Sequence, residues 1–100
     1  MESLRETLVR VMGGYAVKGF NARGYLTSSA DGQILAVVDI AQSSDQHFAD
    51  AGLIVRHVGG KIIIERDMND KVLVDTLLQA GVPRRQIVLA YAGESADAAA

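Results

Sequence analysis

Residues 60–91 constrain the fold more than any other part of the chain. They read GKIIIERDMNDKVLVDTLLQAGVPRRQIVLAY, in which two runs of branched aliphatic residues flank an amphipathic segment that stops at a Gly-Val-Pro triplet. This order predicts a strand over residues 61–66, a helix over about 69–80 and a strand over 87–91. The expected buried stripe of the helix consists of Leu73, Leu77 and Leu78, with Val74 or Ala80 beside them.

The N-terminal half predicts one helix followed by strands. A Ser-x-x-Glu capping box opens a helix over residues 3 to about 18, with apolar residues at helical spacing. A strand is expected around residues 23–27. A near-continuous apolar strand over 34–40 is expected to be central and covered on both faces. Residues 42–52, QSSDQHFADAG, are polar and turn-rich and are predicted to form a loop.

A glycine pair at positions 59 and 60 separates two apolar runs and is a strong signal for a two-residue β-hairpin. In the register that this turn implies, Val58 lies opposite Lys61 and each earlier residue pairs in turn. One face of the hairpin is mostly apolar and suits the core; its residues are Leu53, Val55, His57, Ile62, Ile64 and Arg66. The other face mixes aliphatic and charged residues: Ile54, Arg56, Val58, Lys61, Ile63 and Glu65.

The mixed face is the predicted contact surface. Exposed branched aliphatic residues beside charges are typical of surfaces that bind another protein. Arg56 and Glu65 are diagonal neighbours there, within reach of a cross-strand ion pair. Arg84 and Arg85, after the second helix, form either a solvated loop that assists the helix carbonyls or an anion or partner contact. The candidate interface residues are therefore Ile54, Arg56, Val58, Ile63, Glu65, Arg84 and Arg85.

Composition limits both the fold and the class of function. One hundred residues fit one domain, and a hydrophobic content of 49% supports one core without disulfides. Consecutive strands with hairpin-length loops imply an antiparallel sheet, and helices near both ends imply an α+β fold. With no cysteine in the chain, thiol nucleophiles and Cys-based zinc sites are excluded.

Charge and hydropathy indicate the expected surroundings of the protein. Ten basic and 12 acidic residues give a formal charge of −2, which does not favour tight direct binding of nucleic acid. The N-terminus, MESLRETLVR, mixes acids and bases too closely for a signal peptide. No apolar run approaches the length of a membrane span. We therefore expect a cytoplasmic protein with no membrane contact.

The sequence holds no catalytic or metal-binding constellation that we recognise. His47 and His57 have no third metal ligand at fixed spacing. The acidic run over residues 67–71 lacks the glycine and the final acid of a calcium loop, and is interpreted as helix-capping groups. None of the three lysines completes the acid-x-Lys triplet of metal-dependent nucleases, and no phosphate-binding glycine motif occurs. These observations predict a non-enzymatic protein without a cofactor or metal.

The motifs, taken in order, resemble the XisI family, the fdxN element excision controlling factor proteins. The resemblance rests on the GKIxIxxD pattern over residues 60–67, the AGVP stop over 80–83 and the IVL strand over 87–89. It is close over residues 59–91 and covers about 90 residues in outline. Ile63 stands where the family usually has Trp, and an alanine-rich ending replaces the family's C-terminal extension.

The element order predicts an N-terminal helix, an antiparallel sheet of about four to five strands, and a C-terminal helix followed by a last strand, and the resemblance likewise implies a small α+β protein without its own catalytic site. Residues 1–92 would form one XisI-like domain and residues 93–100 a flexible tail. Relatives act in the excision of a DNA element in nitrogen-fixing cyanobacteria. They are commonly paired with XisH, a family that looks like restriction-type nucleases.

The expected function is therefore that of an accessory protein that controls DNA excision by binding an XisH-like partner. One alternative is a homo-oligomeric module, such as a homodimer, that pairs through the same mixed face and has no DNA role. A second is an enzyme or metal-binding protein of unrecognised type.

Overall fold

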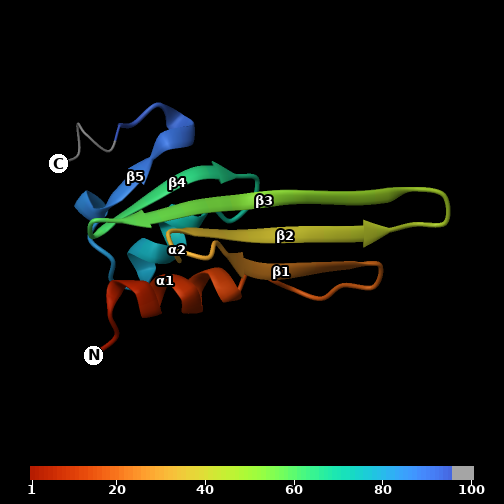
Figure 1. Ribbon diagram of the computed structural model, residues 1–100, viewed down its shortest axis with the longest axis horizontal. Helices are drawn as coiled ribbons and strands as arrows, with labels where there is room; N and C mark the ends of the chain where they lie inside the picture. The colour runs from red at the N-terminus through yellow and green to blue at the C-terminus, as the bar shows by residue number, and fades with distance from the viewer. Residues whose placement is uncertain (96–100) are drawn as a thin grey trace.

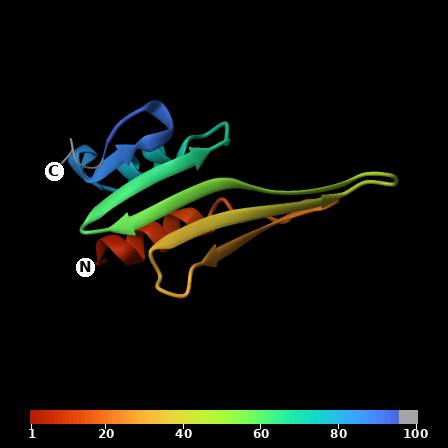
Figure 2. The ribbon, with the colours of Figure 1, turned by 45° about the horizontal axis from the view of Figure 1, so that its top comes forward.

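Two helices lie on the same side of a five-stranded sheet in the computed structural model, which describes residues 1–95 (Figures 1 and 2). Strands β1 to β4 form an antiparallel meander, and β5 pairs in parallel with β4 after the chain returns through α2. The predicted α+β fold is confirmed. The elements are α1 (Leu4–Gly13), β1 (Ala22–Ser28), β2 (Ile34–Gln42), β3 (His47–Val58), β4 (Lys61–Asp67), α2 (Leu73–Gln79) and β5 (Ile87–Leu89), with short 3-10 turns η1 (Arg84–Gln86) and η2 (Ala90–Ala92).

The core lies between the sheet and the helices. Side chains alternate across a strand, so every second residue of the central strands faces the helices and is buried. The helices contribute an apolar stripe at spacings of three and four residues. The core is built from aliphatic side chains and Met12: Leu8, Val11, Met12, Leu35, Val37, Leu53, Val55, Ile62, Ile64, Leu73, Val74, Leu77, Val82 and Ile87.

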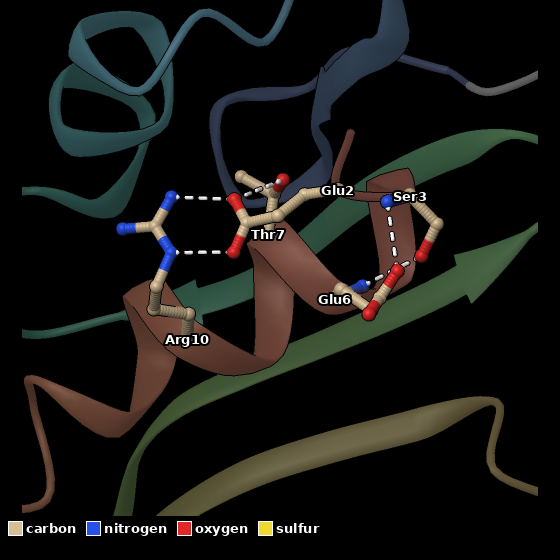
Figure 3. A network of polar contacts seen from close by, with 5 residues as sticks. All are labelled: Glu2, Ser3, Glu6, Thr7 and Arg10. Atoms are coloured by element: carbon tan, nitrogen blue, oxygen red, sulfur yellow. Dashed lines mark hydrogen bonds and ion pairs between the residues drawn. The ribbon is translucent and has the colours of Figure 1, made fainter.

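Helix α1 begins as the sequence predicts but ends earlier. The Ser3 hydroxyl accepts a hydrogen bond from the Glu6 amide, and the Glu6 carboxylate accepts one from the Ser3 amide, both at 3.0 Å (Figure 3). The expected continuation to about residue 18 is wrong, because the helix ends at Gly13. Beyond it the chain crosses the edge of β1, where the Gly24 amide donates to the Val17 carbonyl at 2.8 Å. That pairing requires extended rather than helical backbone.

The expectation that β2 is covered on both faces is wrong. Leu35 and Val37 are buried beneath the helices, whereas Ile34 and Ile40, on the opposite face, are 42% and 40% exposed. The physical reason is the connectivity. Antiparallel strands are joined by hairpins, and α2, the crossover helix of residues 1–95, lies on the same side as α1, so neither helix in this part of the chain covers the second face.

The predicted loop over residues 42–52 is also wrong. β2 and β3 continue past the helices as a projecting arm, with Gln42 opposite His47 and Val38 opposite Ala51 (Figure 1). Polar residues suit these strand ends because both of their faces are exposed. The polarity of the segment therefore indicated exposure, not the absence of strand pairing.

The β3–β4 hairpin follows the predicted register near its turn and departs from it farther away. Pairing runs from Val58 opposite Lys61 to Val55 opposite Ile64, as expected. Glu65 is then skipped, so Ile54 pairs with Arg66 instead of Glu65. This bulge corrects the prediction that placed Arg66 on the core-facing side. Arg66 lies on the side of Ile54, away from the helices.

Helix α2 is shorter than predicted and begins at Leu73. Its N-cap residue, Val72, makes no capping side-chain bond. Asp67 supplies the cap from a distance, because its carboxylate accepts the Leu73 amide at 2.6 Å and the Asn69 amide at 3.0 Å. Leu78, expected in the buried stripe, is 41% exposed, because only one side of this short helix faces the sheet. The last strand ends at Leu89 and turns into η2, two residues earlier than expected.

Replacing Asp67 by Ala is expected to lower the free energy of unfolding by about 2 kcal/mol, because three donors to its carboxylate lose their acceptor. Asp70→Ala is the matched control. Asp70 is exposed, and its removal should change stability by less than about 0.5 kcal/mol. Urea unfolding of both variants measures the difference. Equal losses would contradict the assigned capping role.

Candidate partner-binding surface

The sheet face opposite the helices, here called the outer face, brings most of the predicted interface residues together. The strand register places alternate residues of β1 to β4 on it. Its members over the body of the sheet are Arg23, Tyr25, Thr27, Ile34, Ala36, Val38, Ile40, Ile54, Arg56, Val58, Lys61, Ile63, Glu65 and Arg66.

Arg56 and Glu65 form the cross-strand ion pair that the sequence places within reach. The Arg56 Nε atom lies 2.6 Å from the Glu65 Oε2 atom. Both side chains are substantially exposed, at 43% and 36%, so the pair adds little to stability. It holds one positive and one negative group at defined positions on the outer face.

The predicted aliphatic contacts differ in accessibility. Ile54 and Val58, on β3, are half-buried and present part of their surface to solvent. Ile63 belongs to the outer face by register but is only 4% exposed, at a point where η2 packs against β4. In this conformation Ile63 therefore supports its neighbours and offers almost no surface to a partner.

Arg84 and Arg85 lie at the β5 edge of the sheet. Arg84 donates to the Ile87 carbonyl at 2.7 Å and pairs with the Glu94 carboxylate at 2.7 Å. The Leu89 amide also donates to Glu94, and these contacts, the backbone bond first, lower the pKa of that carboxyl. Arg84 thus holds the chain after η2 against the sheet. Arg85 is exposed, and its carbonyl accepts a hydrogen bond from Lys61.

The predicted flexible tail begins in this region. Residues 93–95 are described, and they include the tethered Glu94. Residues 96–100 of that tail lie outside the described part of the chain. The domain boundary at residue 92 therefore stays a prediction.

Three exposed residues of the outer face were missed by sequence reasoning. Tyr25, Ile34 and Ile40 are 43%, 42% and 40% exposed, and the Arg23 guanidinium lies 4.9 Å from the centre of the Tyr25 ring. The residues of β2 are almost all apolar, so the sequence does not show which of them face the helices. The alternation that would have revealed them is visible only once the register with β1 and β3 is known.

The described residues bear on metal binding and on membrane insertion as follows. Residues 1–95 contain no group of three His, Asp or Glu side chains that could hold a metal ion. His57 lies on the helix side, where burial and, to a lesser degree, the charge of Arg5 lower the pKa of its imidazole. No helix in this part of the chain is long and apolar enough to cross a membrane.

A comparison with protein families shows to which family the chain belongs. The sequence profile described as "XisI protein" matches residues 26–98, well over half of the chain. The chain belongs to the XisI family. The resemblance expected from the sequence motifs is therefore confirmed. No curated protein matches the chain in a direct search.

Two solved structures share the fold of this XisI-family chain. A XisI-like protein from Anabaena variabilis ATCC 29413 is 19% identical, with a TM-score of 0.73 over 85% of this chain and 81% of the other. The fdxN element excision controlling factor XisI from the same organism is 21% identical, with a TM-score of 0.65 over 87% and 88%. At these identities the likeness concerns the fold alone.

Proposed function

We propose that this XisI-family chain is a non-enzymatic accessory protein that controls the excision of a DNA element by binding an XisH-type, nuclease-like partner. Family membership supports the process, since one solved structure of this fold is described as an fdxN element excision controlling factor. The outer face carries the proposal. It exposes aliphatic and aromatic side chains that neither helix covers.

The size of this face suits a protein partner. Strands lie about 4.8 Å apart and rise about 3.3 Å per residue. The four strands of the outer face and the nine residues of β2 therefore span roughly 19 Å by 30 Å, or about 570 Å². A standard protein–protein interface buries about 800 Å² on each partner. The outer face can therefore supply most of such an interface.

In the proposed role this chain acts by binding its partner and supplies no catalytic groups itself. Tyr25, Ile34 and Ile40 provide the exposed apolar area. Arg56 and Glu65 add a charge pattern that can set the orientation of the partner. The nuclease-like partner would supply any reacting groups, and this chain would determine when and where they act.

Co-expression with the XisH-family protein of the same genome tests this proposal. We expect the two proteins to elute together in size-exclusion chromatography and light scattering, with a mass equal to the sum of their protomers or a multiple of it. The same experiment on each protein alone is the control. Absence of any complex at about 50 micromolar, a concentration that would reveal a binding free energy of about −6 kcal/mol, would count decisively against it.

A further inference from the structure

The outer face is positively charged although the chain as a whole is negative. It carries four basic residues and one acidic residue, a net charge of +3, whereas the whole chain has a formal charge of −2. The charged residues of the face are Arg23, Arg56, Lys61, Arg66 and Glu65. Asp50, within β3 and opposite Asp39 of β2, pairs with Arg66 at 3.1 Å, and including it leaves +2. Lys18, opposite Arg23 beside β1, adds one more positive charge at the other edge.

These charges border an apolar strip. Strand β2 contributes Ile34, Ala36, Val38 and Ile40 to the face and no charged residue. Cations lie on both sides of it, Arg23 on β1 and three basic residues on β3 and β4. The face therefore presents a central aliphatic strip with a basic border, the arrangement of an interface with an apolar core and a polar rim.

We propose that the outer face binds a surface of the partner protein that is apolar at its centre and acidic around it. This inference rests on the proposed function. The net positive charge of the outer face favours an acidic protein surface over the other possible ligands. A second copy would bring two positive faces together, which electrostatic repulsion disfavours. Nucleic acid would match the charge but would leave the aliphatic strip without apolar contacts. Tyr25 is the one aromatic side chain among the members of the face on which a base could stack.

The proposal predicts a dependence on salt and on the basic border. Attraction between an acidic surface and exposed cations is screened as ionic strength rises. We expect the affinity for the XisH-family protein, measured by titration calorimetry, to fall about tenfold between 50 and 500 mM NaCl. Arg66→Glu should weaken binding about tenfold at low salt, because it reverses one charge of the border.

Arg10→Glu provides a matched control. Arg10 lies on α1, on the helix side of the sheet, and is exposed and paired with one acid, Glu2, at 2.8 Å. Arg66 is likewise exposed and paired with one acid, Asp50. Both reversals change the net charge equally, so a general charge effect would weaken binding equally. A contact through the outer face predicts that only Arg66→Glu weakens binding by more than about twofold.

The outcomes separate this inference from the proposed function. A complex that is insensitive to salt, or equally weakened by Arg66→Glu and Arg10→Glu, overturns the inference and leaves the partner role intact. Absence of any complex overturns both. If Arg66→Glu weakens the binding of a 30-base-pair DNA duplex and leaves the affinity for the XisH-family protein unchanged, the face binds nucleic acid instead. If the isolated chain forms a dimer in 50 mM NaCl and Ile40→Arg dissociates that dimer, the face binds a second copy of the chain.

Discussion

Arg56→Glu is expected to weaken the complex with the XisH-family protein at least thirtyfold and to leave the fold intact. Arg56 lies on β3, the central strand of the sheet, and buried interface arginines commonly contribute about 2 kcal/mol or more to binding. The ion pair with Glu65 is exposed in the free protein, so its loss should lower the free energy of unfolding by less than about 1 kcal/mol. Titration calorimetry and urea unfolding measure the two effects.

The double variant Arg56→Glu/Glu65→Arg is the control for this prediction. It restores an ion pair in the reversed orientation and the original net charge of the face. We expect it to regain the stability of the original protein and to regain binding only in part, since a partner surface is complementary to the sign at each position. Unchanged binding by the single variant would remove the outer face from consideration as the interface.

Leu77→Ala is expected to lower the free energy of unfolding by about 3 kcal/mol. The Leu77 side chain is fully buried between α2 and the sheet, and its truncation leaves a cavity that the aliphatic core fills only in part. This loss is a large fraction of the total stability expected for a chain of this size, which is about 5–15 kcal/mol. Urea or thermal unfolding followed by circular dichroism measures the loss.

The next residue along the helix is the matched control. Leu78 has the same chemistry and the same helix, but its side chain is 41% exposed. Leu78→Ala should cost less than about 1 kcal/mol, because little apolar surface leaves a packed environment and alanine favours the helix. Similar losses for the two variants would mean that α2 presents a different side to the sheet.

Local signals in the sequence predicted those parts of the fold that depend on neighbours along the chain. The capping box at Ser3 and the two-residue turn at Gly59 and Gly60 form as expected, because each is complete within a few residues. The C-terminal boundary of α2 also follows from a local pattern, with Gly81 in a left-handed conformation. The candidate ion pair between Arg56 and Glu65 followed from the hairpin turn alone.

Errors in the prediction concern features that depend on distant segments. Helix α1 ends at Gly13 because the following residues pair with β1, a contact that helical periodicity does not reveal. The arm formed by β2 and β3 carries polar residues on strands that remain paired. The bulge at Glu65 changes the side on which Arg66 lies, and with it the charge of the outer face.

The sequence by itself determined both helices, the hairpin at Gly59 and Gly60, the lack of cysteine chemistry and the membership of the XisI family through its ordered motifs. Only the tertiary structure decided which side of β2 is free and which cations surround it. The physical reason is that a run of apolar residues carries no alternation to mark its buried side. The placement of both helices on one side of the sheet settles that choice and leaves Tyr25, Ile34 and Ile40 exposed beside Arg56 and Arg66.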